Sequence, residues 1–317
     1  MLSVVVDLGG TNIRLAVCEL ITGELTQLKT FPCAEFTSLE DVLVQYFESL
    51  DEDVSHLCIA IASALDGDYV AMLNLHWAFS IRALKQKLCL TSFYVINDYT
   101  AISLALPFLL PSDKIKIGGG EVQPNGVTAV FGPGTGLGVS HIIHIADKWI
   151  SLEGEGGHVS FTPNTQEQSD ILAHLQAKFG HVSAERVLSG QGLVNIYQSL
   201  SELSDSLIQF DHPKNILQAG LANECPIARK SLDIFCQVMG SFAGNIALNL
   251  NCTGGVYIAG GIVPRFISFF EQSAFRRYFE EKGRVKGMLK KIPTFLITKD
   301  NPGLLGASVY LRQALGS

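Results

Sequence analysis

The sequence reads VVVDLGGTNIRLAVC over residues 4–18, and this stretch decides the fold. Val4–Asp7 predict a buried strand, Leu8–Thr11 a tight turn, and Ile13–Glu19 a second strand. A third strand is expected near residues 25–31, after the turn Thr22-Gly23-Glu24. The first two strands are therefore expected to pair antiparallel, which excludes a dinucleotide-binding strand–helix–strand unit at this position.

The turn of this hairpin has the composition of a phosphate-binding loop. Glycine lets the backbone come close to an anion and point its N–H groups at it, and Thr11 adds a hydroxyl donor. Asp7 ends a buried strand, where a carboxylate is costly unless it is hydrogen-bonded or close to a cation such as Mg²⁺. An ordinary hairpin turn capped by an aspartate explains the same residues equally well, so both interpretations stay open.

A second glycine-rich hairpin opens the other half of the chain. Residues 132–138 read GPGTGLG between predicted strands at Val127–Phe131 and Leu137–Ile145. No Gly-Lys-Ser/Thr follows, so this is not a Walker A loop, and it does not open a helix. Two such hairpins, one in each half, favour a nucleotide triphosphate that is gripped from two sides.

Polar residues follow several of the other predicted elements. Asp98 comes directly after the predicted strand Phe93–Ile96, where a carboxylate can accept a proton from an attacking hydroxyl. The residues alone favour a simpler role for Asp98, as the N-cap of a following helix. Residues 153–158 read EGEGGH, a loop that suits the binding of polar ligand groups, whereas Glu185 looks like part of a helical first turn.

Composition sets the broad class of the protein. The chain has 317 residues, 47% of them hydrophobic and 17% charged, which allows two lobes with large cores. A formal charge of −7 gives no basic footprint for nucleic acid or a membrane surface. Seven scattered cysteines without a C-x-x-C pair, and an N-terminus that reads as a strand and not as a signal peptide, predict a cytoplasmic protein with reduced thiols.

The helical segments are marked by caps and by apolar spacing. Residues 37–40, TSLE, have the form of a capping box before an apolar stripe at helical spacing. The longest helical pattern runs from Pro226 to about Leu250, and a last helix is expected from Gly303 onward. Residues 107–126, with three prolines and four glycines, are expected to cross between the lobes.

Seven strings, in this order and at this spacing, resemble the bacterial glucokinases of the actin/hexokinase-like phosphotransferase fold. The resemblance runs essentially the full length of the chain. The strings are DLGGTNIR (7–14), IND (96–98), GTGLGV (134–139), GEGGHV (154–159), GHVSAERVLSG (180–190), IAGGIVPRF (258–266) and DNPGLLG (300–306).

The resemblance implies an α/β, two-lobed, ribonuclease H-like fold with the active site in the cleft between the lobes. The small lobe would be residues 1–108 with 301–317, and the large lobe residues 109–300. It implies ATP-dependent phosphorylation of glucose to glucose 6-phosphate, with Mg²⁺ arriving with ATP near Asp7, by a homodimer.

The resemblance also implies roles for individual residues. Asp98 would be the general base. The sugar would be bound by Asn97, Asp98, Glu155, His158 and Glu185. The nucleotide would be bound by Asp7, Leu8, Gly9, Gly10, Thr11 and Asn12, by Gly132, Gly134, Thr135 and Gly136, and by Gly260 and Gly261 near the adenosine.

Three alternatives stay open. The first is a kinase for another hexose or with another phosphoryl donor, because residues 63–68, SALDGD, depart from the proline-containing family pattern beside the sugar site. The second is a repressor–kinase, although the zinc motif and N-terminal DNA-binding helices of that family are not found in the sequence. The third is a non-catalytic sugar sensor or actin-like filament, which has no need of the polar cluster around Glu155.

Overall fold

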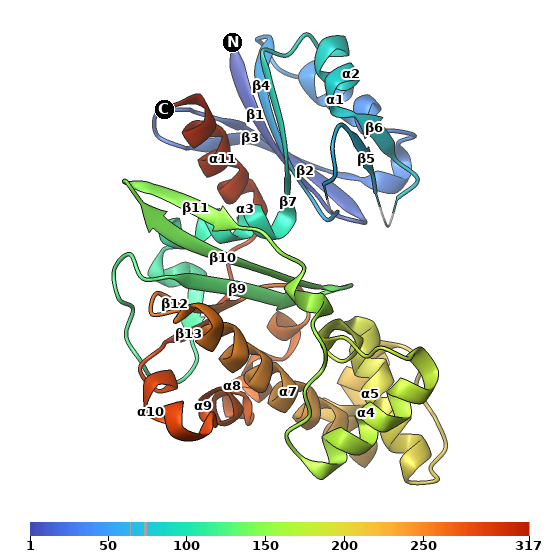
Figure 1. Cartoon of the computed structure of the whole chain (residues 1–317). Helices are drawn as coiled ribbons and strands as arrows, with labels where there is room; N and C mark the ends of the chain where they lie inside the picture. The colour runs from blue at the N-terminus through green and yellow to red at the C-terminus, as the bar shows by residue number, and fades with distance from the viewer. Residues whose placement is uncertain (64, 73–74, 317) are drawn as a thin grey trace. The chain divides into compact units, whose positions relative to one another are not determined.

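The computed structural model describes residues 1–63, 65–72 and 75–316, so Ala64 of the departing 63–68 loop lies outside it (Figure 1). The chain divides into two compact units. The first unit comprises Met1–Leu110, Ile145–Glu153 and Lys299–Ser317, and the second comprises Pro111–His144 and Gly154–Thr298. The predicted lobes, 1–108 with 301–317 and 109–300, stay a prediction; the compact units differ from them mainly by placing residues 145–153 in the first unit.

The first unit is built on a five-stranded sheet in the order β3-β2-β1-β4-β7. These strands are β1 (Leu2–Leu8), β2 (Asn12–Cys18), β3 (Leu25–Pro32), β4 (Val54–Ile61) and β7 (Ser92–Asn97). The predicted hairpin is confirmed, because β1 pairs antiparallel with β2 and β2 antiparallel with β3. β4 and β7 continue the sheet in parallel, which places the ends of β1, β4 and β7 at one edge.

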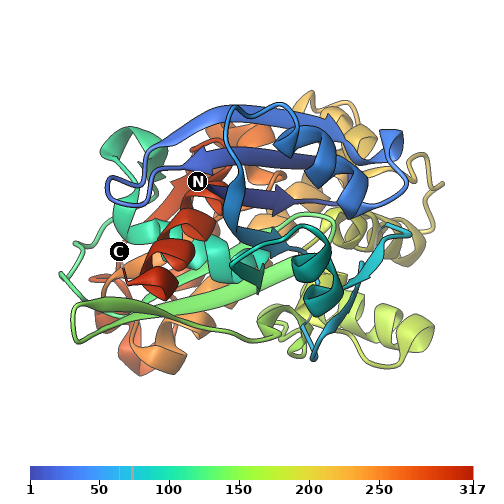
Figure 2. The same ribbon diagram turned by 90° about the horizontal axis from the view of Figure 1, so that it is seen from above.

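Helices cover both faces of this sheet, so its central strands are apolar on both sides. Val4 and Val6 face a core shared with α1 (Leu39–Phe47) and α2 (Ile81–Lys87), whereas Val5 faces one shared with α3 (Asp98–Ala105) and α11 (Pro302–Leu315). In Figure 2, the last helix, drawn in red, lies beside the first strands, drawn in blue. The first unit also holds β5 (Tyr69–Ala71), β6 (Ala78–Ser80) and β11 (Lys148–Leu152).

The cap of α1 differs by one residue from its prediction. Ser38 is the N-cap, and its hydroxyl accepts a hydrogen bond from the backbone N–H of Asp41. The predicted box from Thr37 to Glu40 is therefore wrong in register. Thr37 instead donates its hydroxyl to the Asp41 carboxylate at 2.5 Å, so the same cluster of short polar residues closes the helix start in another way.

The second unit repeats the plan of a hairpin followed by parallel strands. Its strands run in the order β10-β9-β12-β13-β8. They are β8 (Lys114–Lys116), β9 (Thr128–Pro133), β10 (Leu137–Ile145), β12 (Gly255–Ile258) and β13 (Thr294–Ile297). β9 pairs antiparallel with β10 and parallel with β12, so the predicted second hairpin is confirmed.

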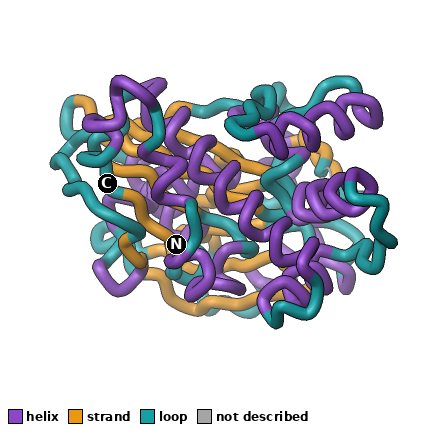
Figure 3. The backbone as a smooth tube through the Cα atoms, turned by 90° about the horizontal axis from the view of Figure 1, so that it is seen from below, coloured by secondary structure: helices purple, strands orange, loops and turns teal. Residues whose placement is uncertain are grey.

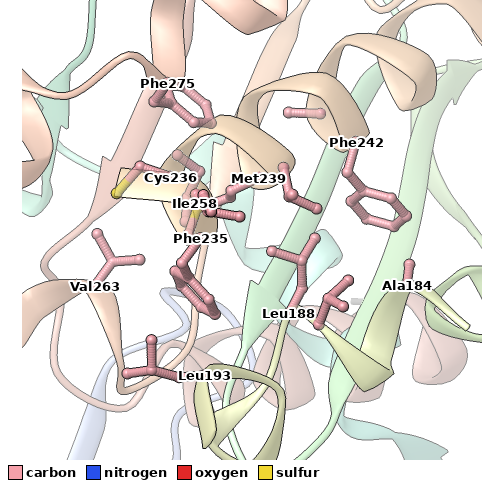
Figure 4. Close-up of a cluster of buried hydrophobic side chains, with 14 of the residues drawn as sticks. Ala184, Leu188, Leu193, Phe235, Cys236, Met239, Phe242, Ile258, Val263 and Phe275 are labelled. Carbon is pink, nitrogen blue, oxygen red and sulfur yellow. The ribbon is translucent and has the colours of Figure 1, made fainter. Parts of the chain in front are cut away.

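Helices make most of the core of the second unit. The 25-residue helix α7 (Pro226–Leu250), which has the predicted bounds, supplies Phe235, Cys236, Met239 and Phe242 to the buried cluster shown in Figure 4. The other helices of this unit are α4 (Gln166–Phe179), α5 (Gly190–Leu203), α6 (Pro213–Leu221), α8 (Ile267–Gln272), α9 (Phe275–Glu280) and α10 (Lys286–Leu289). Figure 3 shows both helices, in purple, and strands, in orange, as the α/β class requires.

Two further features bear on the class of the protein. In residues 1–63, 65–72 and 75–316, no helix combines the length and the apolar character that a membrane span needs. All seven cysteines are free thiols; Cys89 is exposed and the other six are buried, as the scattered spacing predicts.

Candidate active site

Asp7 and the first glycine hairpin lie at the end of β1 in the first unit. The N–H of Gly9 donates to the carbonyl of Asn12 at 3.0 Å and closes the turn. Asp7 pairs in register with Arg14, whose Nη1 lies 3.6 Å from the Asp7 carboxylate. Burial raises the pKa of Asp7, and the Arg14 charge opposes that rise in part. A further cation would therefore favour the ionised form of Asp7.

Asp98 follows β7 at the start of α3. Asn97 is the N-cap of this helix and accepts hydrogen bonds from the N–H groups of Tyr99 and Thr100 at 2.8 and 3.3 Å. The N-cap role considered for Asp98 is therefore wrong: its carboxylate accepts a bond from Tyr99 N–H at 3.0 Å and interacts with the Asn97 side chain, but it does not cap the helix. Burial raises the pKa of Asp98 to about 7, and the nearby charge of Asp7 adds to the effect.

The start of α11 lies against Asp7. A Cβ built on Gly303 would lie 3.0 Å from the carboxyl carbon of Asp7, so glycine permits this approach. The N-terminus of a helix carries free N–H groups and a partial positive charge, which favour a nearby anion. The string DNPGLLG matched the family at this position but suggested no role; the structure adds Gly303 to the surroundings of Asp7.

The glycine-rich hairpin of the second unit, residues 132–138, joins β9 and β10. Gly134 N–H donates to the Gly136 carbonyl at 2.8 Å, and Gly190 N–H donates to the Gly134 carbonyl at 2.9 Å. Thr135 is exposed at the tip of the turn. Gly260 follows β12 with a φ of +86°, and a Cβ there would overlap the carbonyl of Pro133. The structure therefore brings Gly260 onto the same hairpin as Gly132–Gly136.

The polar loop of residues 154–158 lies beside the same hairpin. Its Glu155 and His158 side chains are exposed, with His158 Nε2 3.8 Å from the Glu155 carboxylate. Glu185 lies in the short turn Ala184–Arg186, where its Oε2 accepts the N–H of Leu137 at 2.9 Å. Ala184 N–H donates to the carbonyl of Val159 at 2.8 Å and ties this turn to the polar loop.

The predicted site residues thus gather in two groups. The first unit brings together Asp7–Asn12, Asn97 and Asp98. The second unit brings together Gly132–Gly136, Glu155, His158, Glu185 and Gly260–Gly261. Prediction missed Arg14, Gly303 and the Leu137 N–H as neighbours of these carboxylates. The adjacent glycines Gly156 and Gly157 are a sequence signal that could have indicated close packing at the polar loop, because glycine permits close backbone approach.

Comparison with known proteins gives consistent results. A glucokinase family profile matches residues 4–314. The glucokinase of Yersinia pestis (strain Pestoides F) is 53% identical over 310 residues, which cover 98% of this chain and 96% of that protein. The crystal structure of glucokinase from an Antarctic psychrotroph superposes with a TM-score of 0.89 at 32% identity, covering 98% of this chain and 99% of that one.

A more distant structure supports the fold alone. A ROK family glucokinase from Streptomyces griseus, in complex with glucose and AMPPNP, superposes with a TM-score of 0.64 at 19% identity over 99% of this chain and 100% of that one. Together with the two sheets, each opened by a glycine hairpin, these likenesses place the architecture among the actin-like sugar kinases. The chain belongs to the glucokinase family.

Proposed function

We propose that this protein is an enzyme that transfers the γ-phosphate of ATP to the 6-hydroxyl of glucose, with Asp98 as the general base. The observation that carries the proposal is the Asp98 carboxylate, which is free of the helix cap and has a pKa raised to about 7. A base with a pKa near the working pH is the most effective at proton transfer. Family membership supports the sugar-kinase class and the ATP donor.

The proposed reaction is an in-line transfer. Asp98 removes the proton of the 6-hydroxyl as its oxygen bonds to the γ-phosphorus, and the bond from that phosphorus to the bridging oxygen breaks to release ADP. Asn97, Glu155, His158 and Glu185 bind the sugar hydroxyls. The N–H groups of the two glycine hairpins bind the phosphates and stabilise the charge that develops on them, and Gly260–Gly261 lie toward the adenosine.

Mg²⁺ is part of the proposal, and the first unit offers a fitting ligand. The carboxylate of Asp7 is largely buried, its pKa is raised, and it lies close enough to a second carboxylate, Asp98, to raise the pKa of that group. Oxygen ligands of this kind suit Mg²⁺. Asp7 would hold the ion directly or through water, and the bound ion would supply positive charge against the β- and γ-phosphates.

The rest of the proposal follows the family resemblance. It comprises a homodimer in the cytoplasm, and lobes bounded at 108/109 and 300/301. Neither nucleic acid nor a membrane is a proposed partner. Glucose and ATP are the proposed substrates.

A phosphorylation assay tests the function. The protein is incubated with ATP and Mg²⁺ and a panel of glucose, mannose, fructose and amino sugars, and ADP release is measured. A kcat/KM for glucose at least tenfold above the other sugars supports the proposal. Preference for another sugar, or for polyphosphate over ATP, would favour the alternative kinases; no turnover together with ATP-dependent sedimentation would favour a filament.

The rate should depend on pH through Asp98. Because the base acts in its ionised form and its pKa is raised to about 7, we expect kcat to rise as the pH increases from 5.5 to 8 and to level off above. Below the pKa the log of kcat should fall with a slope near one. Initial rates at saturating glucose and ATP measure this profile, and a flat profile between pH 5.5 and 8 would contradict the assignment.

Glu155 should affect sugar binding more than chemistry. A hydrogen bond to a charged group contributes about 1.5–3 kcal/mol, so we expect Glu155→Gln to raise the glucose KM by roughly 10- to 100-fold with a much smaller change in kcat. Glu153→Gln is the matched control, because Glu153 is also exposed and accepts a hydrogen bond from the Thr100 hydroxyl in the first unit. An equal loss in both variants would argue against a specific role for Glu155.

A further inference from the structure

The peptide group of Leu137 touches both functional loops of the second unit. Its N–H donates to Oε2 of Glu185 at 2.9 Å. Its carbonyl oxygen lies against Gly157 of the polar loop, so closely that a Cβ on Gly157 would overlap it. Leu137 is the first residue of β10 and therefore part of the glycine hairpin assigned to the nucleotide phosphates.

Glycines make this close packing possible at two more positions. A Cβ on Gly136 would lie 2.6 Å from Oε2 of Glu185, so the carboxylate rests on the bare backbone of the hairpin turn. A Cβ on Gly156 would lie 2.9 Å from the Cβ of Val139 in the same strand. A side chain at Gly136 would push the Glu185 carboxylate away from the hairpin, and one at Gly156 would push the polar loop away from it.

Further hydrogen bonds fix the other end of Glu185. The hydroxyl of Ser189 donates to the Glu185 carbonyl at 2.9 Å, and Ser189 is also the N-cap of α5. The next residue, Gly190, donates its N–H to the Gly134 carbonyl at 2.9 Å. The segment from Glu185 to Gly190 thus contacts the hairpin at two points, through the Glu185 carboxylate at Leu137 and through the Gly190 N–H at Gly134.

We propose that Gly136 and the Leu137 peptide position the Glu185 carboxylate for the sugar, so that the nucleotide hairpin sets the affinity for glucose. The proposal rests on the proposed function, in which Glu185 binds sugar hydroxyls and the hairpin binds phosphate. A nucleotide bound on the hairpin acts on Glu185 through the Leu137 peptide, so a shift of that peptide changes the position of the carboxylate and with it the affinity for glucose. The coupling is reciprocal, so bound glucose strengthens nucleotide binding by the same factor.

A purely structural role for the Glu185–Leu137 bond makes a different prediction. In that case the bond would stabilise the fold, and its loss would lower the melting temperature without a selective effect on glucose. If the bond instead positions Glu185, its loss changes the glucose dissociation constant and the dependence of that constant on nucleotide. The melting temperature and the glucose dissociation constant together therefore separate the two roles.

The test compares two glycine-to-alanine substitutions in the second unit. Gly136→Ala places a methyl group against the Glu185 carboxylate, whereas a Cβ on Gly287, in α10, meets no atom within 4 Å. We expect Gly136→Ala to weaken glucose binding without nucleotide by roughly tenfold, since a displaced charged hydrogen bond is worth at least that much. Gly287→Ala, which changes no residue of the site, should leave the glucose dissociation constant within twofold.

Calorimetry of glucose binding, with and without a non-hydrolysable ATP analogue and Mg²⁺, measures the coupling. In the unmodified protein the analogue should tighten glucose binding several-fold, within the range of about 5- to 150-fold typical of coupled sites. This ratio should fall to about one in Gly136→Ala. Glu185→Asp, which keeps the charge but shortens the reach to Leu137, should lose the coupling as well; Glu185→Gln, which keeps an acceptor for the N–H, should retain it.

The outcomes distinguish this proposal from the proposed function. Glucose kinase activity in the unmodified protein, with unchanged glucose binding and coupling in Gly136→Ala, would overturn the positioning role and leave the function intact. Absence of glucose binding in the unmodified protein would overturn both. If Gly136→Ala does not fold, by circular dichroism, the comparison of Glu185→Asp with Glu185→Gln gives the same decision.

Discussion

Replacing Asp98 with asparagine is expected to lower kcat by about 10²- to 10⁴-fold, the usual contribution of a positioned general base. Asparagine has the same shape, and its side-chain oxygen can still accept the hydrogen bond from Tyr99 N–H. The fold and the glucose KM should therefore change little. Steady-state kinetics at pH 8 give kcat and KM together, and turnover above a tenth of the unmodified rate would rule out the base assignment.

Stability provides a second check on the same substitution. The pKa of Asp98 is raised above its ordinary value by burial, so folding disfavours the ionised form. The loss of stability develops between the ordinary pKa of 3.8 and the raised pKa of about 7, is complete above pH 7, and is absent only below the ordinary pKa, where the carboxyl is protonated in the unfolded chain as well. Asp98→Asn should therefore melt at the same temperature as the unmodified protein or higher at pH 8, with the difference shrinking as the pH falls toward 3.8. Asp51→Asn, an exposed aspartate in the same unit, is the control and should show neither effect.

The second large effect is expected at Gly306, where α11 crosses α3. A Cβ on this glycine would overlap the backbone carbonyl of Ala101, and neither helix backbone can move without disturbing the sheet beneath it. Overpacking of this kind destabilises by about 1–3 kcal/mol and by more when the clash is with backbone. We expect Gly306→Ala to lower the free energy of unfolding of the first unit by at least 2 kcal/mol, at the upper part of that range. Denaturant unfolding followed by circular dichroism measures it.

Replacing Gly287 with alanine should raise the free energy of unfolding, the opposite of the effect expected at Gly306. Gly287 lies in α10 with no atom within 4 Å of a built Cβ. Alanine there should stabilise the second unit by roughly 0.5–1 kcal/mol, because glycine loses more backbone entropy on folding. If Gly306→Ala lowers the free energy of unfolding and Gly287→Ala raises it, the loss of stability at Gly306 comes from the close crossing of α11 and α3 and not from the loss of a glycine. A decrease of similar size at both positions would contradict this explanation.

Much of the fold could be predicted because its signals are local. The apolar run of residues 4–6, the two glycine turns and the long stripe of α7 are each local signals, and all three were confirmed. The α1 cap was wrong by one residue because Thr37 and Ser38 are both good caps, and adjacent short polar side chains compete for the same free N–H groups.

The candidate site was harder to predict because its geometry depends on long-range contacts. The position of Asp98 after β7 was visible in the sequence, but its pKa depends on burial and on Asp7, which is 91 residues away along the chain. Likewise, Glu185 looked like an ordinary helical first turn. Its contact with Leu137 comes from the packing of two turns 48 residues apart, which no local pattern records.

The segmented first unit has a consequence for the order in which the protein can mature on the ribosome. Its sheet is complete by Asn97, but the face that carries Val5 and Ala60 is covered by α11, which lies beyond the whole second unit in the sequence. Roughly 145 residues separate Glu153 from Lys299, which at about 5–20 residues per second is a delay of roughly 7–30 s. During that time only α3 is available to cover this apolar face, and the part that α11 covers in the finished unit is exposed on the nascent chain. The second unit can therefore finish folding first, and chaperones have a defined surface to protect.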